Sequence, residues 1–582
     1  MVCQLLNISY CPPSEIDFSG GKSLASIFSV LFASGIMQMS FPCFILEHRF
    51  NGFLMLQILV VYNSLGWKRD DIVRIPVITE DITVHNSEGK VVKSQILPLA
   101  DAHVSVRNYY VKAYLGETTS VRPKYWLAFP ASVPPLGFST YTIASGGSST
   151  RSSIYTLQTS DESSFEVAQG NLKLTFSTRE GKLTHYVNDR TSVKQSVEQS
   201  YSFYSAYNGT EKDPQASGAY IFRPNGTFLI GSEKQAPLTV VHGPLIDEVH
   251  HQINPWIHQI NRLYNGKEHV EVEFTVGPIP VDDGVGKEVV TQLTTTMVTN
   301  KTFYTDSSGR DFIKRIRDYR TDWNLEVNQP VAGNYYPINL GIYVQDNTSE
   351  FSVLVDRSVG GSSILDGQIE LMLHRRLLHD DSRGVAEALN ETDCIVNECR
   401  GLTIQGKYYF RIDPLGQGAR WRHSYGQEIY SPFLLAFTEE DGGNWMGTHV
   451  HTFSGFDSSY SLPDNVAMIT LEELNDGKVL LRLAHLYEID EDKDLSTITK
   501  VELKKLFLGK KISKVMETNL SANQERAEME KKRLVWKVEG EPGGETQVIR
   551  GGPVDPKTLV VELAPMEIRT FIIHFDSSFF RQ

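Results

Sequence analysis

Few side chains in this 582-residue sequence have the types and spacing of a reactive centre. His449 and His451 stand two positions apart, so in a strand both imidazoles would lie on one face, a spacing that can bind a metal ion. No third ligand is suggested near them, and edge-strand histidines without a ligand are several times more frequent. Asp380 and Asp381 are adjacent carboxylates, but strand or turn geometry would not direct both at one bond. The residues themselves therefore predict no metal site and no catalytic centre.

Seven sites for N-linked glycosylation are spread along the sequence, each with the pattern Asn-x-Ser/Thr and no intervening proline. One such site is weak evidence, whereas seven are typical of a glycoprotein of the secretory route. The sites are Asn7, Asn208, Asn225, Asn300, Asn347, Asn390 and Asn519. The N-terminus has no basic segment followed by an apolar run, so no signal peptide is predicted. We therefore expect the sequence to be incomplete at its front.

The five cysteines do not have the spacing of a zinc site. Cys3 and Cys11 flank a short loop that a disulfide could close, and this pair is predicted. Cys394 and Cys399 are also close, but in one strand they would lie on opposite faces, so their bond is left open.

The composition is that of a globular protein with an acidic surface. The formal net charge is −14 and the pI is near 5.6, which argues against nucleic-acid binding because phosphate neutralisation needs clustered Lys and Arg. An acidic balance does not by itself identify a partner.

The hydrophobic pattern is that of strands nearly throughout. Residues 165–177 and 269–276 alternate between apolar and polar side chains, and Gly-containing turn signals recur between such runs. Helical periodicity is scarce; residues 521–533 give the best candidate, which a surface helix or loop explains. Many short strands with regular turns predict a mainly β fold of several sandwiches. A Gly/Ser-rich linker at 144–153 separates a first β unit from a larger one.

Several blocks of sequence occur in one order that is shared with a known family. They include CQLLNISYCPPSE, VYNSLGWKRDD, QASGAYIFRP, EVHHQINPW, FYTDSSGRDF, DRSVGGSS, HRRLLHDDSRG and LLRLAHLYE. In these blocks the sequence resembles the C-terminal half of the class II α-mannosidases, glycoside hydrolase family 38, of the lysosomal or plant vacuolar type. The resemblance covers nearly the whole chain.

The exception is residues 23–57, an insert without a family counterpart. It contains an uncharged run, 23–46, that is long enough to cross a bilayer as a helix. Several serines, Gln38 and Pro42 argue against a membrane span, and the flanking charges set no orientation. A translated intron or a gene-model error is the favoured interpretation; a membrane anchor and a buried helix are the alternatives.

The resemblance implies β-sandwich domains, including a large mutarotase-like supersandwich. The expected division is a segment after the catalytic and helical region (1–22), the insert (23–57), a small sandwich (58–143), a large sandwich (154–400) and a C-terminal β domain (401–582).

The resemblance also implies a chemistry. Retaining glycosidases use two carboxyl groups about 5 Å apart, and the family adds a zinc ion that binds sugar hydroxyls. The blocks with the nucleophile, the acid/base and the zinc ligands lie upstream of this chain, so no catalytic residue and no bound zinc are expected here. Tyr220 and Arg383 are the expected substrate-binding residues. Either could equally have a purely structural role.

The implied partners are α-mannoside glycans and the N-terminal catalytic domain, in a vacuole, a lysosome or outside the cell. The chain alone would then be inactive. Two alternatives remain: a standalone carbohydrate-binding or scaffold β protein, and a membrane-anchored β protein.

Overall fold

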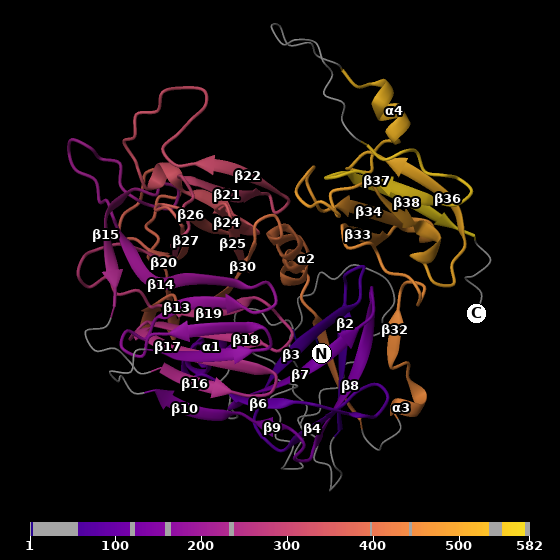
Figure 1. The fold of residues 1–582 in the computed structure, drawn as a ribbon, viewed down its shortest axis with the longest axis horizontal. Coiled ribbons are helices and arrows are strands. Elements are labelled where there is room, and N and C mark those ends of the chain that lie inside the picture. The colour runs from indigo at the N-terminus through magenta and orange to yellow at the C-terminus, as the bar shows by residue number, and fades with distance from the viewer. Residues whose placement is uncertain are drawn as a thin grey trace.

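The computed structural model describes residues 2–3, 56–116, 123–157, 164–231, 238–395, 398–440, 445–534 and 550–576. These residues are built mainly from strands, which confirms the predicted fold class (Figure 1). The strands form three sandwiches, each around its own hydrophobic core.

The large sandwich consists of a ten-stranded and a nine-stranded sheet. In spatial order the first contains β10 (Ser153–Leu157), β16 (Leu238–His242), β17 (Ile246–Asn254), β18 (Ile257–Tyr264), β19 (Val270–Val276), β30 (Ile404–Pro414), β25 (Ser349–Val355), β24 (Gly341–Gln345), β21 (Thr302–Ser307) and β22 (Asp311–Ile316). The second contains β11 (Phe165–Gln169), β12 (Leu172–Phe176), β13 (Leu183–Asn188), β14 (Val193–Ala206), β20 (Lys287–Thr295), β27 (Gln368–Arg376), β26 (Val359–Ser362) and β23 (Tyr336–Ile338), with β15 (Pro224–Ile230) beside β14. Their apolar faces enclose one continuous core.

The small sandwich combines strands from distant parts of the chain. One sheet has the order β1 (Val2–Cys3), β31 (Leu434–Glu440), β2 (Leu56–Asn63), β8 (Gly137–Ser145), β4 (Ile82–His85) and β5 (Val91–Val92), with β32 (Thr452–Ser454) paired to β8. The other has the order β3 (Arg69–Val77), β7 (Tyr125–Val133), β6 (Gln95–Pro98) and β9 (Thr150–Arg151).

The C-terminal sandwich is the smallest of the three in strand number. A four-stranded sheet, β33 (Val466–Glu473), β34 (Val479–His485), β38 (Ile568–Phe575) and β36 (Ile512–Thr518), packs on a pair, β35 (Thr499–Glu502) and β37 (Val560–Leu563). Apart from the helices, the other described elements are a hairpin, β28 (Thr392–Ile395) with β29 (Glu398–Gly401), and the short 3-10 turns η2 (Ala332–Asn334), η3 (Asn475–Gly477) and η4 (Leu503–Lys505).

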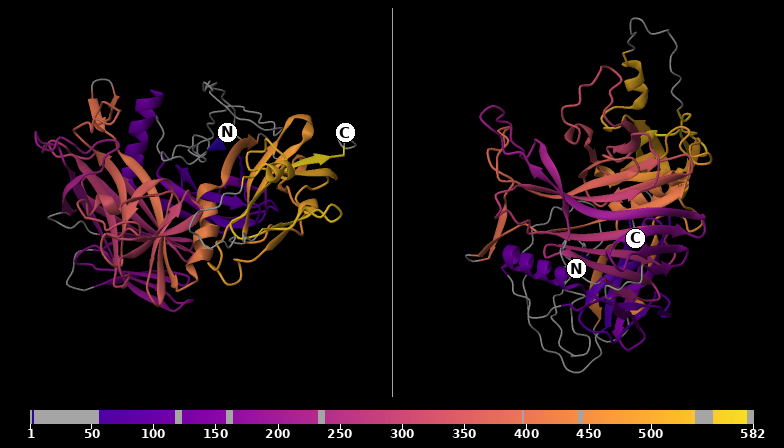
Figure 2. Two further views of the ribbon diagram at one scale, coloured as in Figure 1. Left: turned by 90° about the horizontal axis from the view of Figure 1, so that it is seen from above. Right: turned by 60° about the vertical axis from the view of Figure 1, so that its left-hand side comes forward.

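Two helices of more than three turns were not predicted. They are α1 (Asp101–Leu115) and α2 (Gly418–Tyr430). α2 lies between the large and the C-terminal sandwiches (Figures 1 and 2), where Trp421 packs against the former and Ala419 against the latter. Two short helices complete the described chain, α3 (Trp445–Thr448) and α4 (Arg526–Lys531); α4 is the helical part of the predicted segment 521–533.

The strand pairing crosses two of the expected divisions. β30 follows residue 400 but pairs with β19 and β25 inside the large sandwich. β31 lies between β1 and β2, so the small sandwich includes residues beyond 143. In both cases the sheet is completed by a strand that lies far away in the sequence, so local sequence patterns do not show where the domain ends. The division into domains stays a prediction.

The disulfide of the described residues joins Cys394 and Cys399, the pair for which the sequence gives no decision. The single-strand argument against it was wrong, because the two residues are partners across the β28–β29 hairpin. Cys11 and the uncharged run at 23–46 lie outside the described residues, so the predicted Cys3–Cys11 bond and the nature of the insert stay predictions. No helix among the described residues is long and apolar enough to cross a membrane.

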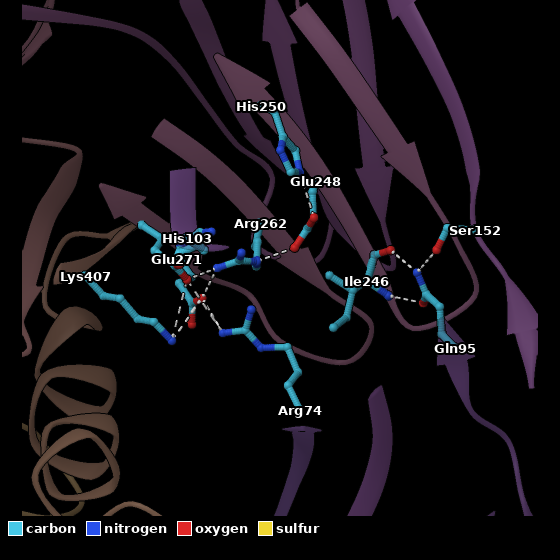
Figure 3. A network of polar contacts seen from close by, with 11 residues as sticks. Arg74, Gln95, His103, Ser152, Ile246, Glu248, His250, Arg262, Glu271 and Lys407 are labelled. Atoms are coloured by element: carbon cyan, nitrogen blue, oxygen red, sulfur yellow. Dashed lines mark hydrogen bonds and ion pairs between the residues drawn. The ribbon is translucent and has the colours of Figure 1, made fainter. Parts of the chain in front are cut away.

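The small and large sandwiches meet through buried charges. On β19, Val270, Val272 and Phe274 face the core, while Glu271 and Glu273 face the small sandwich and are also buried. Arg262 of β18, wholly shielded from solvent, donates to both glutamates and to Glu248 of β17 (Figure 3). We call this contact between the small and large sandwiches the joint. It contains a buried polar network, although apolar residues of similar size would often give an equally stable contact.

The small sandwich and α1 supply the other half of this network. Arg74 of β3 binds Glu271 at 2.9 Å, and His103 of α1 contacts Glu273 (Figure 3). The amide of Gln95, on β6, accepts from the backbone N–H groups of Leu245 and Ile246 and donates to the Ile246 carbonyl, each at 2.9 Å. These contacts fix the position of the small sandwich relative to the large one.

Replacing Arg262 with methionine is predicted to lower the free energy of unfolding by about 3–5 kcal/mol, because three carboxylates would stay buried without their shared cation. Calorimetric thermal unfolding measures the change. Arg151→Met is a matched control: Arg151 is largely exposed and pairs with Glu80 at 3.0 Å, and exposed pairs contribute about 0–1 kcal/mol. Equal destabilisation by both variants would contradict the role given to Arg262.

Buried titratable groups predict that stability falls with falling pH. Burial lowers the pKa of His258 to about 3, so it stays neutral in the folded chain and takes up its proton only on unfolding below about pH 6.5. Burial would raise the pKa of Glu271, but Lys407, Arg74 and Arg262 lower it to about 2, so its contribution is full above pH 4.5 and lost toward pH 2. Melting temperatures measured from pH 7 to pH 3 should decrease steadily. A constant melting temperature over this range would contradict the argument.

Candidate functional site

Tyr220 and Arg383 are brought together although 163 positions separate them in the sequence. Tyr220 lies in the loop between β14 and β15, and Arg383 in the loop that follows β27. The carboxylate of Asp381 joins the two loops: Oδ2 accepts from the backbone N–H groups of Tyr220 (2.6 Å) and Ile221 (2.9 Å), and Oδ1 from that of Arg383 (3.1 Å). Asp381 is 2 % exposed, whereas Tyr220 is 67 % exposed and Arg383 is also exposed. We define these three residues as the candidate site.

Gln215 makes a second connection between the loops. Its side-chain N–H donates to the Asp381 carbonyl at 2.9 Å, and its oxygen accepts a hydrogen bond from the Arg383 guanidinium. Gly218 makes the close approach possible, since a Cβ there would lie 2.6 Å from both the Cβ and the backbone N of Asp381. No larger residue fits at this position without displacing one loop.

An ion pair between the half-buried Arg375 and the buried Glu288 supports the Tyr220 loop. Arg375, at the end of β27, donates to the carbonyls of Gly218 (2.9 Å) and Ala219 (3.4 Å). Glu288 of β20 holds Arg375 in place at 2.5 and 2.9 Å. Burial raises the pKa of the Glu288 carboxyl, and the Arg375 charge opposes that shift. Arg375 thus holds carbonyl groups of the Tyr220 loop, and Asp381 holds its N–H groups.

An aromatic cluster packs beside this support. Phe222 contacts Tyr204 and Tyr335, with ring centroids 5.6 and 4.9 Å away. Both tyrosine hydroxyls donate to the buried carboxyl of Glu370, whose pKa is raised by its burial. The cluster makes the chain just after Tyr220 a part of the packed interior.

The candidate site can bind but cannot by itself break a glycosidic bond. A phenol and a guanidinium can donate hydrogen bonds to sugar hydroxyls, but neither is a nucleophile at neutral pH. Burial would raise the pKa of Asp381, but the amide groups of Ile221, Tyr220 and Arg383 lower it overall, so the carboxylate is ionised and already occupied. As expected, Asp380 and Asp381 are not directed at one bond, because Asp380 accepts from the N–H of Ser382.

The two histidines with metal-like spacing do not lie on a strand, so that expectation was wrong. His449 follows α3, and its ring stacks on Trp445 at a centroid distance of 4.4 Å; His451 lies on the same indole at 6.1 Å. Across the described residues, no group of three or more His, Cys, Asp or Glu could hold a metal ion. The described residues therefore do not fit a zinc ion.

Most predicted glycosylation sites are on the surface. Asn208, Asn225, Asn300, Asn347 and Asn390 are exposed, and Asn519 is half-buried. Asn7 lies outside the described residues. The Asn390 side chain accepts a hydrogen bond from Arg376 at 2.7 Å. Modification of these residues stays a prediction.

Three family descriptions match successive parts of the chain. They are the central domain of lysosomal α-mannosidase-like proteins (residues 92–143), the C-terminal domain of glycosyl hydrolases family 38 (167–383) and the C-terminal β-sandwich domain of that family (465–571). Tyr220, Asp381 and Arg383 all fall within the second region.

Similar proteins match almost from end to end of this chain. A probable α-mannosidase of Arabidopsis thaliana is 60% identical over 99% of the chain and 54% of its own length. An α-mannosidase of Canavalia ensiformis is 50% identical over 98% of the chain and 55% of its own length. The human lysosomal α-mannosidase is 36% identical over 88% and 48%. The chain belongs to glycoside hydrolase family 38 and matches its C-terminal half. It spans about half the length of these curated relatives.

A solved structure supports the same fold for this family 38 chain. The α-mannosidase from Enterococcus faecalis V583 superposes with a TM-score of 0.55 and 14% identity, over 89% of this chain and 56% of that one. At this identity the likeness concerns the fold alone.

The sequence indicated Tyr220 and Arg383, whose role in substrate binding stays a prediction, but not the residues that hold them. Gln215, Gly218 and Arg375 have no motif of their own, and their roles depend on contacts over more than 150 positions. The one available signal is the acidic pair before Arg383, but residue types do not show which groups it binds. Asp381 accepts from backbone N–H groups, and the Arg383 guanidinium donates to Gln215.

Gly218→Ala is predicted to destabilise the chain by about 1–3 kcal/mol, because the added methyl group overlaps Asp381 and separates the two loops. Thermal unfolding and limited proteolysis of the loops measure this. Gly333→Ala is the matched control, since a Cβ there meets no atom within 4 Å. If both variants melt at the wild-type temperature, the close approach at Gly218 is not a constraint.

Proposed function

We propose that this chain is the C-terminal part of a zinc-dependent, retaining α-mannosidase that hydrolyses terminal α-mannosides of glycoprotein glycans. It contributes Tyr220 and Arg383 to substrate binding, and it is inactive without an N-terminal catalytic domain. Family membership supports the reaction class. The observation that carries the proposal is the joining of two exposed donors, Tyr220 and Arg383, by the buried Asp381.

The division of labour follows from the chemistry of the side chains. Retaining hydrolysis needs a nucleophile and an acid/base about 5 Å apart, and the candidate site offers no such pair. Zinc would act as a Lewis acid on sugar hydroxyls when bound, and its ligands would come from the other half because the described residues do not fit the ion. Tyr220 and Arg383 would orient the sugar through hydrogen bonds and so favour the reactive geometry.

The proposed location is a vacuole or lysosome, or the space outside the cell. The names of the mammalian relatives specify the lysosome for those proteins. The six potential glycosylation sites among the described residues fit passage through the secretory route.

The decisive experiment compares the chain alone with a chimaera that also carries the half of a relative that this chain does not match. The front half of the 60% identical Arabidopsis relative, which this chain does not cover, is fused to the complete chain, and both proteins are assayed on an aryl α-mannoside with added zinc. We expect turnover by the chimaera and none by the chain alone. In the chimaera, Tyr220→Phe and Arg383→Met should each lower kcat/KM by about 10-fold or more, since each removes a hydrogen bond to substrate.

Matched variants separate a specific effect from general damage. Tyr319→Phe and Arg320→Met change an exposed tyrosine and the neighbouring half-buried arginine, both outside the candidate site, and should leave kcat/KM unchanged. Turnover by the purified chain alone would contradict the proposed dependence on the other half. Unchanged kcat/KM in both site variants would remove their role in substrate binding. Tight binding of α-mannosides by the chain alone would favour a standalone carbohydrate-binding protein.

A further inference from the structure

The position of the Tyr220 phenol depends on its backbone. With two thirds of its surface exposed, the side chain makes no hydrogen bond to the described residues, so nothing at the phenol end holds the ring. Its location is set by the peptide groups on either side, and these are held by Asp381. A shift of those peptide groups would move the hydroxyl by at least as much.

The position of Arg383 depends on the same carboxylate by a different route. Asp381 Oδ1 accepts from the Arg383 N–H, and the Asp381 carbonyl holds Gln215, whose side-chain oxygen accepts from the guanidinium. Asp381 thus fixes the backbone of Arg383 directly and its side chain through Gln215. The distance between the two exposed donors is therefore set by one buried side chain.

The arrangement is more specific than loop stability requires. Arg375 and Glu288 already hold the carbonyls of Gly218 and Ala219, and Phe222 anchors the end of the loop in the aromatic cluster. What Asp381 adds is a link between the Tyr220 loop and the Arg383 loop, through charge-assisted hydrogen bonds that are stronger than neutral ones. A link of this kind is needed if both donors must meet one ligand.

We propose that Asp381 is a positioning residue of the mannosidase reaction: it sets the spacing of the Tyr220 hydroxyl and the Arg383 guanidinium so that both bind one sugar at once. This inference rests on the proposed function. Asp381 itself touches no substrate, because its side chain is buried and its carboxylate oxygens face the backbone amides of the two loops. Gln215 assists it for Arg383 only.

The test is a double-mutant cycle in the chimaera. Asp381→Asn keeps the size of the side chain but directs an NH₂ group at a backbone N–H. We expect kcat/KM to fall about 10-fold or more in the otherwise wild-type protein, and less than about 2-fold in a Tyr220→Phe/Arg383→Met background, because the groups to be positioned are then gone. A merely structural residue would lower kcat/KM by the same factor in both backgrounds, and that outcome overturns the proposal.

Asp306→Asn provides the matched control. Asp306 is 3 % exposed and its Oδ1 accepts from three successive backbone N–H groups, those of Asn339, Leu340 and Gly341, in the same sandwich but outside the candidate site. The Asp306→Asn substitution should lower the melting temperature without changing kcat/KM. An equal loss of kcat/KM in Asp306→Asn and Asp381→Asn overturns the proposal.

Gln215→Met keeps the test decisive if Asp381→Asn does not fold. Gln215 is only half-buried, and methionine has a similar volume. The loss of kcat/KM caused by Gln215→Met should disappear in an Arg383→Met background, because Gln215 acts through Arg383. It should persist in a Tyr220→Phe background. Equal losses in both backgrounds overturn the proposal. If Tyr220→Phe and Arg383→Met themselves change nothing, the proposed substrate contacts fail, which is a different result from failure of the positioning role.

Discussion

The buried guanidinium of Arg262 is the interaction on which the arrangement of the small and large sandwiches depends. Apolar contacts such as those of Trp126 with Ile246 and Tyr264 bring the two together but do not specify one orientation. Directional contacts add that specificity: Arg74 shares the Glu271 carboxylate with Arg262, and the side-chain oxygen of Gln95 accepts from the backbone N–H of Leu245. This joint covers part of the outer face of the ten-stranded sheet, whereas the candidate site is formed by loops of the opposite, nine-stranded sheet.

The candidate site follows a different design from the joint. At the joint, side chains are fixed and buried; at the site, the backbone is fixed and the functional side chains project into solvent. Asp381, Arg375 and Gly218 hold the peptide groups on both sides of Tyr220. The backbone of such a surface needs little rearrangement to meet a ligand that a second domain presents, so the ordering cost on binding is confined to the exposed side chains.

The sequence predicted the parts of this structure that depend on local pattern. Alternation at 269–276 identified a strand, but whether Glu271 and Glu273 face water or a second sandwich depends on residues up to 200 positions away. α1 was not recognised because its core-facing pattern is irregular and its valines and tyrosines are typical of strands. The Cys394–Cys399 bond and the surroundings of His449 were misjudged because both arguments assumed a continuous strand where the chain turns.

Of the site, the resemblance supplied Tyr220 and Arg383, and the structure supplied their connection. Asp381 was visible in the sequence as one of two adjacent carboxylates, but its acceptor role requires the Tyr220 loop, 160 positions earlier. Hydrogen bonds to backbone amides leave no trace in residue types, since any residue can provide the donor. Gly218 is the exception in principle, although a lone glycine in a Gly-containing loop gives no reason to expect a close contact.

The place of β31 in the small sandwich determines the order in which the chain can fold during synthesis. β31 pairs along its length with β2, for example Leu435 with Val61. In the sequence, however, 370 residues lie between the end of β2 at Asn63 and the start of β31 at Leu434. The whole large sandwich is formed from this intervening part of the chain. On the ribosome, β2 and β8 can pair early, but the edge of β2 stays open until residue 440 has emerged. The large sandwich, whose last strand β30 ends at Pro414, is therefore complete before the small sandwich that precedes it in the chain. An open strand edge during that interval is a site for wrong pairing, so β2, rather than any strand of the large sandwich, is the element that needs shielding while residues up to 440 are made.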